Sequence, residues 1–321
     1  MPVWLLATTL LVAPAGDEWS PATNPPPTPW AMAGARGWRL CQEAERRARA
    51  AHDDNRTRGT RAEEEGQWAR RARQCPHAVH VLLEAAQEEV TATKTLLKDL
   101  DLGGDAEDHA IQIQRLVEEH RERLEQALGW LDAAIAESGR RGQRPPRETL
   151  YYRAYALTTL GRIPEARTAL REVREQGDVQ RWRIERMAAL VELFAGDIEE
   201  ALRRAHRGVY DAPAEDRIIS RYIRALVLDR AGASAVAKAE IRALSAISGA
   251  ELSLPVTESV LPVHERLFLR ALVDQARGLQ SPALRYWQAY LLRPEPEEPE
   301  RVLARRHLDE LTPSPMPAGG P

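Results

Sequence analysis

The sequence predicts an all-α fold, arranged as an α-solenoid of antiparallel helical hairpins with an N-terminal hairpin and a C-terminal capping helix. The composition is rich in the helix formers Ala, Leu, Arg and Glu, only 5% of the residues are aromatic, and no segment has the pattern of a β-strand. At 321 residues the chain is long for one compact core, but a stacked hairpin needs only its neighbours to bury its apolar face. A recurring pair of glycine and alanine then gives the second half of the chain a period.

The N-terminus has the features of a secretory signal peptide. An apolar run fills residues 3–12, and Ala13 and Ala15 place small side chains at the two positions that a signal peptidase reads. We therefore expect cleavage after Ala15 and a periplasmic or secreted protein. No Lys or Arg precedes the apolar run, so a misassigned start codon or a buried first helix stays an alternative. No later stretch reaches about 18 apolar residues, so no membrane span is expected in the mature chain.

Prolines mark both ends of the helical part. Five prolines between residues 21 and 29 exclude a helix there, and three more between residues 294 and 299 separate the last helix from the others. The predicted segments are a signal peptide (1–15), a Pro-rich linker (16–36), N-terminal helical hairpins (37–140), repeats (147–294), a capping helix (300–311) and a disordered tail (312–321). Whether residues 79–139 belong to the repeat stack is left open, because they carry no clear repeat signature.

Cys41 and Cys75 are the only cysteines, and we predict a disulfide between them. Helical patterns at residues 37–52 and 62–75 flank a polar turn at residues 53–60, and the midpoint between the two cysteines lies in that turn. In an antiparallel hairpin the two sulfurs would face each other, and export would supply an oxidising compartment. Two buried thiols are the alternative.

The repeated glycine and alanine pair defines the predicted hairpins. Each glycine should end one helix, and the small alanine five residues later lets the next helix approach its neighbour closely. The first two intervals, 35 and 36 residues, are close to the roughly 34-residue period of a helix–turn–helix repeat. The third, 46 residues, requires an inserted loop, which residues 248–262 supply with two prolines. The pairs are Gly161 with Ala166, Gly196 with Ala201, Gly232 with Ala237, and Gly278 with Ala283.

This pattern resembles the tetratricopeptide repeat family over about residues 147–294. Small residues stand where the family has its helix-A glycine, and Pro213 falls at its terminal proline position. The helix-A positions are Ala154, Ala189, Ala225 and Ala271, and the helix-B core positions are Leu170, Ala205, Ile241 and Trp287. The family's tryptophan and tyrosine on helix A are largely missing, so a related helical solenoid is an alternative.

The resemblance implies a concave groove, lined by the first helix of each repeat, that binds a protein or peptide. Arginines beside tyrosines suit a peptide carboxylate, because Arg binds carboxylates bidentately and Tyr supplies rigid contact area. The implied partner-binding residues are Tyr151, Tyr155, Arg183, Arg186, Tyr222 and Asp229. The same residue types are also common on solvated or half-packed helix faces, which is the plainer interpretation.

The sequence offers few candidates for catalysis or for a metal site. His77, His80 and Glu84 would share one helix face, but no further ligand is near in sequence, so we expect no metal. A His-Glu pair at residues 264–265 lacks the second His of a metalloprotease motif. Phosphate-binding Gly-rich loops, a nucleophile-elbow Ser motif and a CxxC pair are also missing from the sequence. We therefore predict no enzymatic activity and no cofactor.

Charge and fold together favour a protein partner. The net charge is −3 and both signs alternate along the predicted helices, so no basic patch points to nucleic acid. We predict a scaffold or adaptor of the bacterial cell envelope, although the sequence does not identify its partner. The alternatives are a cytoplasmic helical regulatory module, with an intact N-terminus and free thiols, and a metal-binding or enzymatic helical protein.

Overall fold

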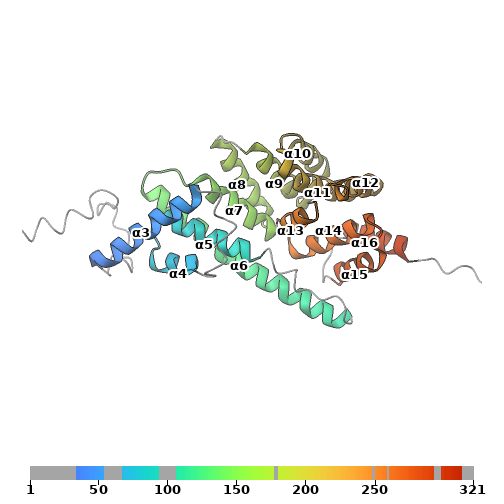
Figure 1. Ribbon diagram of the computed structural model, residues 1–321, viewed down its shortest axis with the longest axis horizontal. Helices are drawn as coiled ribbons and strands as arrows, with labels where there is room; N and C mark the ends of the chain where they lie inside the picture. The colour runs from blue at the N-terminus through green and yellow to red at the C-terminus, as the bar shows by residue number, and fades with distance from the viewer. Residues whose placement is uncertain are drawn as a thin grey trace, which may run out of the picture. The chain divides into compact units, whose positions relative to one another are not determined.

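A computed structural model describes residues 34–53, 67–93, 106–176, 180–247, 250–258, 260–292 and 298–312. Within these ranges every regular element is an α-helix, so the all-α prediction is confirmed (Figure 1). No helix in this part of the chain combines the length and the apolar character that a bilayer crossing needs. The predicted signal peptide and nearly all of the predicted linker and tail lie outside the described residues.

The chain divides into two compact units. Unit 1 comprises residues 1–91 and 125–153, and unit 2 comprises residues 92–124 and 154–321. Three of the described helices contribute residues to both units: α6 (Ala106–Arg140), α7 (Arg147–Thr159) and, through its last residue alone, α5 (Val79–Ala92).

Unit 1 has a core of small side chains. Its first helices, α3 (Gly34–Asp53) and α4 (Gln67–Gln74), agree with the predicted hairpin, and α5 (Val79–Ala92) follows them. Alanines dominate the core and the two larger rings of Trp68 and Trp130 pack at its edge. Small residues let helices approach closely. The buried core residues are Cys41, Ala44, Ala48, Ala72, Cys75, Ala78, Val79, Val81, Leu82, Ala85 and Ala134.

Two helices of unit 1 receive their N-terminal caps from other helices. Neither α4 nor α5 has an acidic residue in its first turn, although the first N–H groups of a helix need acceptors and favour negative charge. Glu88 of α5 supplies a carboxylate to the start of α4, and Glu45 of α3 supplies one to the start of α5. The bonded N–H groups are those of Trp68 and Ala69 (3.1 Å each) on Glu88, and of His80 (3.0 Å) and Val81 (3.4 Å) on Glu45.

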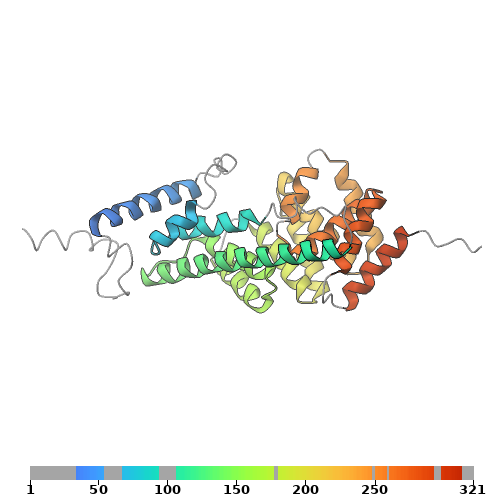
Figure 2. The ribbon, with the colours of Figure 1, turned by 90° about the horizontal axis from the view of Figure 1, so that it is seen from below.

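Unit 2 is a succession of helices in which each packs against the next from α8 to α16 (Figures 1 and 2). Contacts also join helices two places apart, because α11 packs on α9 and α14 packs on α12. The helices are α8 (Ile163–Glu175), α9 (Arg181–Phe194), α10 (Ile198–Tyr210), α11 (Ala214–Arg230), α12 (Ser234–Ser245), α13 (Ala250–Glu258), α14 (Val263–Ala276), α15 (Gln280–Leu291) and α16 (Glu298–Leu311).

The four predicted glycines end helices through one repeated turn. Gly161, Gly196, Gly232 and Gly278 have φ values of 75°, 79°, 80° and 79°, in the left-handed region where a side chain is disfavoured. In each case the next residue donates its N–H to the carbonyl five positions earlier, as Ala233 does to Leu228 at 2.9 Å. This is the Schellman arrangement. The alanine that follows each glycine by five residues is fully buried, so both parts of the prediction are confirmed.

The insertion after α12 is a helix and not the loop that we expected. Residues 250–258 form α13, with Pro255 inside it, and α13 packs on α11, α12 and α14. Leu254 and Thr257 are buried. Apolar residues on both sides of the proline give this segment a face to bury, and this packing outweighs the helix-breaking effect of the proline.

Candidate functional site

Five of the six predicted groove residues are buried, and only Arg183 is half-exposed. Tyr151 lies in unit 1 and the other five lie in unit 2. Tyr151 and Tyr155 are buried, and Tyr222 and Asp229 have no exposed surface at all. A partner could not touch Tyr222 or Asp229 in this structure, so their assignment to an open groove is wrong.

Asp229 is buried because the C-terminal helix covers it. Its Oδ2 lies 3.1 Å from Nε2 of His307 on α16, and both side chains are fully buried. The His307 ring stacks on Trp287 with centroids 4.6 Å apart and nearly parallel planes. Next to it, Arg230 Nη2 lies 2.7 Å from Glu265 and Nη1 lies 3.1 Å from Glu300. These polar side chains contact one another and form part of the core.

The two predicted arginines lie one turn apart on α9. Arg183 is half-buried and donates to the side-chain oxygen of Gln180 at 2.6 Å. Arg186 is 7% exposed, and its guanidinium lies over the ring of Trp182 at 4.9 Å from the centroid. Its Nη1 is buried and has no hydrogen-bond partner among the described residues. Trp182 was not predicted, although its spacing of four residues from Arg186 could have indicated the stacked pair.

Arg183 and Arg186 both act electrostatically on Asp216, in the first turn of α11. Burial raises the pKa of Asp216, and the charges of Arg186 and Arg183 oppose that rise without overcoming it. No ion pair within 4 Å joins Arg186 to an acid in the described part of the chain. A buried guanidinium needs hydrogen-bond acceptors on its several N–H groups. We call Trp182, Arg183 and Arg186 the α9 site.

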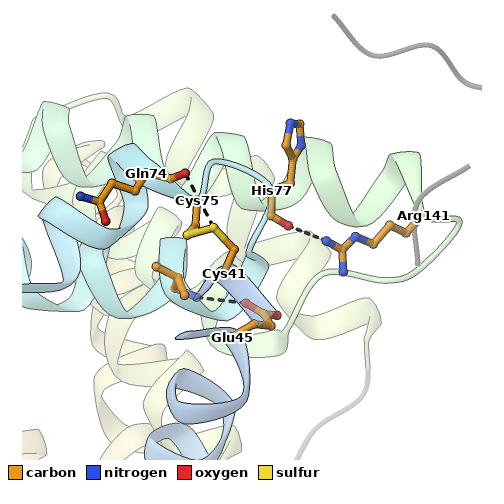
Figure 3. The surroundings of a disulfide bond; sticks show 7 residues. Cys41, Glu45, Gln74, Cys75, His77 and Arg141 are labelled. Carbon is orange, nitrogen blue, oxygen red and sulfur yellow. Dashed lines mark hydrogen bonds between the residues drawn. A yellow bond between two sulfur atoms is a disulfide. The ribbon is translucent and has the colours of Figure 1, made fainter. Parts of the chain in front are cut away.

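The predicted disulfide is present in unit 1. Cys41 of α3 and Cys75, just after α4, are joined by an S–S bond of 2.06 Å, and their Cα atoms are 5.5 Å apart (Figure 3). The bond ties the two helices at one end of the hairpin, beside Glu45 and its contact with the start of α5. The alternative of two buried thiols is therefore wrong for this structure.

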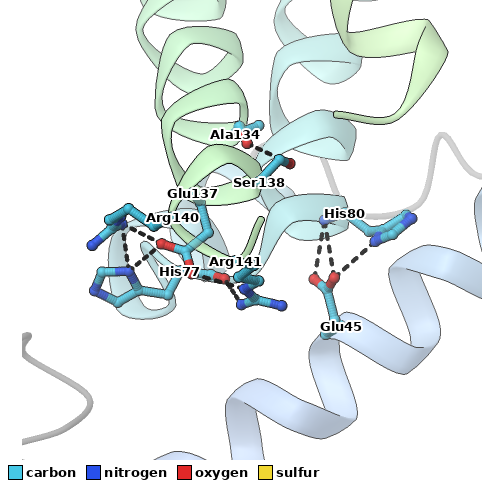
Figure 4. Close-up of polar contacts among 8 residues, drawn as sticks. All are labelled: Glu45, His77, His80, Ala134, Glu137, Ser138, Arg140 and Arg141. Carbon is cyan, nitrogen blue, oxygen red and sulfur yellow. Dashed lines mark hydrogen bonds and ion pairs between the residues drawn. The ribbon is translucent and has the colours of Figure 1, made fainter. Parts of the chain in front are cut away.

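The two histidines considered as metal ligands, His77 and His80, contact different carboxylates. His77 Nδ1 lies 2.7 Å from Glu137 near the end of α6, whereas His80 Nδ1 lies 2.7 Å from Glu45 on α3 (Figure 4). Arg140 and Arg141 also contact Glu137. The described residues contain no group of three or more His, Cys, Asp or Glu side chains placed to hold a metal ion.

The carboxylates of these two pairs are held in their ionised form. Burial alone would raise the pKa of Glu137, but the hydrogen bonds from His77 and Arg141 outweigh burial and lower it. Burial would also raise the pKa of Glu45, but the hydrogen bonds and the charge of His80 outweigh burial and lower that pKa as well. The Glu45–His80 pair joins α3 to α5, and the Glu137–His77 pair joins α6 to the turn before α5, which indicates a structural role.

A buried arginine that the sequence did not single out joins distant parts of unit 2. Arg266 is almost completely buried, and its Nε and Nη1 donate to the carbonyls of Leu261 and Thr93, each at 2.8 Å. Its Nη2 lies 3.1 Å from Nε2 of His120 on α6. Because arginine has donors only, His120 must accept at Nε2 and is therefore neutral.

Unit 2 also contains a large cleft between α6 and the α14–α15 pair. Its volume is about 1240 Å³, and residues of the first half of α6, of α14 and of the end of α15 line it. The lining is mainly apolar and includes Ile111, Val117, Leu267, Ala289 and Leu292. We call it the α6 cleft. Sequence periodicity could have indicated the apolar face of α6, but not the helices across from it.

Comparison with known proteins gives no relative for this chain. No family model, no curated protein and no solved structure matches it.

Proposed function

We propose that this chain is a non-enzymatic scaffold or adaptor that binds a protein or peptide partner through a helical-repeat surface. In this proposal residues 147–294 form a stack of hairpins similar to tetratricopeptide repeats, and α16 caps it. The observation that carries the proposal is the turn that recurs four times, each with a left-handed glycine followed by a fully buried alanine.

The packing of unit 2 supports the same idea. A repeat stack requires each helix to contact its successor and each hairpin to contact the next. The contacts of α9 with α10 and α11, and of α12 with α14, have this form. The short helix α13 then acts as an insertion between two hairpins.

The α9 site is our candidate for partner recognition. Arg186 keeps 7% of its surface exposed although its Nη1 is buried, and Arg183 lies one turn away with a half-exposed side chain, so a ligand would approach through Arg183 and the exposed part of Arg186. Arginine binds carboxylates through paired, charge-assisted hydrogen bonds. The expected ligand is therefore an acidic side chain or a C-terminal carboxylate of a peptide.

The proposal places the protein outside the cytoplasm, in the periplasm or beyond. The apolar N-terminal run favours export, and the Cys41–Cys75 pair is of a kind that persists in oxidising compartments. The intact mass of the protein from its native source would test this placement, because cleavage after Ala15 removes a defined mass.

A pull-down from cell-envelope extract tests the adaptor function. The bait would be the wild-type chain and the double variant Arg183→Glu, Arg186→Gln, each checked by circular dichroism for unchanged helix content. The matched control is Arg171→Glu, Arg242→Glu, because these two arginines are exposed on α8 and α12. We expect one set of proteins to be retained by the wild type and the control and lost from the α9 variant.

A synthetic peptide from the retained partner then identifies the group that is bound. Losing a hydrogen bond to a charged group costs about 1.5–3 kcal/mol, which is roughly a ten- to hundred-fold change in Kd. Replacing the peptide's carboxylate by an amide should weaken binding by that factor. Equal retention by all three baits would contradict the α9 site, and retention of nothing by the wild type would contradict the adaptor function.

A further inference from the structure

The α6 cleft exposes apolar side chains on both of its walls. Ile111 on α6 is 62% exposed and Leu292, at the end of α15, is 37% exposed. Scattered exposed apolar residues are common, but here both line one cleft whose floor is also apolar. A contiguous apolar hollow of this kind marks a surface that another molecule covers.

The α6 wall presents its apolar residues at helical spacing. Ala110, Ile113 and Val117 all line the cleft and are separated by three and four residues, so they lie on one face of the helix. The opposite wall contributes Leu267 and Ala289 from α14 and α15. An open groove between helices, with apolar residues along its length, has the form that accepts an amphipathic helix.

The rim of the cleft is acidic. Glu118, Glu119 and Glu122 line it, against a single arginine, Arg115. Glu118 is bonded to Arg121 and Glu119 to Arg123, but neither of these arginines is among the cleft-lining residues. Glu122 is exposed. Because Arg121 and Arg123 offset Glu118 and Glu119, Glu122 is the exposed acid with which a basic side chain of a ligand could pair.

We propose that the α6 cleft binds an amphipathic helix of a partner protein, with an apolar stripe in the cleft and lysine or arginine side chains beside α6. Complementary charge fixes the orientation and increases the association rate, while the apolar contacts supply most of the affinity. This site is separate from the α9 site, because none of its residues lies on α9. It favours a basic ligand, whereas the α9 site is proposed to bind an acidic one.

A peptide-display selection tests the proposal directly. A library of helix-forming peptides with random side chains would be selected against the full chain. We expect enriched peptides to carry apolar residues at positions i, i+3 or i+4, and i+7, with basic residues on one flank. Enrichment of acidic peptides, or no enrichment, would overturn the proposal.

Binding of one enriched, fluorescein-labelled peptide then locates the site. In fluorescence anisotropy, Ile111→Asp and Glu122→Arg should each raise Kd at least tenfold, and added salt should weaken binding to the wild type. The matched control is Val236→Asp on α12, because Val236 is as exposed as Ile111 but lies outside the cleft. All three positions are exposed, and circular dichroism checks each fold. Equal binding by Ile111→Asp and the wild type would refute the cleft as the site.

Two further measurements distinguish binding of a partner helix in the α6 cleft from binding at the α9 site and from self-association. The double variant at Arg183 and Arg186 should bind the basic peptide as the wild type does, so a failed α9 site and a failed cleft can be told apart. Sedimentation velocity of the chain alone should show a monomer in the concentration range used. A dimer that Ile111→Asp dissociates would mean that a second copy occupies the cleft, and would overturn the assignment to a partner helix.

Discussion

Acidification should destabilise unit 2 through one buried histidine. His120 is 3% exposed and accepts a hydrogen bond from Arg266. Burial, and then the charges of Arg266 and His264, lower the pKa of His120 from 6.5 to about 2. The folded protein therefore keeps this side chain neutral at pH values where an unfolded chain would protonate it.

The size of the effect follows from linkage. Between pH 6.5 and about 2 the unfolded state binds one proton more than the folded state, so stability falls as the pH falls below 6.5. Above pH 6.5 this contribution is fully present. Going from pH 7 to pH 5 should lower the free energy of unfolding by about 2 kcal/mol from His120 alone.

Urea unfolding at the two pH values measures this contribution. The comparison is between the wild type and His120→Gln, because glutamine keeps an oxygen that accepts from Arg266 but does not titrate. The other titrating groups are common to both proteins and largely cancel in the difference. We expect the wild type to lose about 2 kcal/mol more than the variant on acidification. Equal losses would refute the argument that His120 is held neutral.

Two other changes test the local geometry. Replacing Cys41 and Cys75 by alanine should lower the free energy of unfolding of unit 1 by about 3–4 kcal/mol, because the disulfide closes a loop of 34 residues. Urea unfolding measures this loss, and an unchanged midpoint would show that the disulfide does not constrain the hairpin. Gly232→Ala should lower the free energy of unfolding by about 1–2 kcal/mol, and with it the melting temperature, because a side chain is strained at a φ of 80°. No atom lies within 4 Å of the added methyl group, so a steric clash would not contribute. The control is Gly139→Ala, where the added methyl group is also free of neighbours but φ is not positive, so it should not destabilise the chain. A loss of stability as large as that of Gly232→Ala would show that the positive φ is not the cause.

Local features were predictable from the sequence because their causes are local. A glycine that ends a helix needs only its own φ and the carbonyls of the preceding turn, so Gly161 and its three counterparts could be placed correctly. The Cys41–Cys75 pairing was predictable because an antiparallel hairpin places residues at equal distance from its turn opposite each other.

The candidate site was predicted less well because residues distant in sequence cover some of its side chains. Asp229 is covered by His307, which is 78 residues away, and no spacing within one repeat could indicate that contact. Arg266 likewise meets His120 and Thr93 at separations of 146 and 173 residues. The resemblance to tetratricopeptide repeats supplied a register for the first helix of each repeat, but it could not indicate that α16 packs over Asp229.

Arg186 remains the most informative of the predicted residues when it is compared with the other buried charges of unit 2. Glu185, its neighbour, lies 2.9 Å from Arg204, and Arg266 has carbonyl acceptors at 2.8 Å. Arg230 bonds Glu265 at 2.7 Å through Nη2, although its Nε and Nη1 have no hydrogen-bond partner within the described part of the chain either. Removing a charge from water costs several kcal/mol unless partners compensate for it. Arg186 has the ring of Trp182 and the distant charge of Asp216, but its Nη1 has no acceptor among the described residues. Nη1 itself has almost no exposed surface, so a ligand could meet Arg186 only through the 7% of the residue that stays exposed, beside the half-exposed Arg183. These two neighbouring cations are the physical reason for proposing a carboxylate ligand at α9.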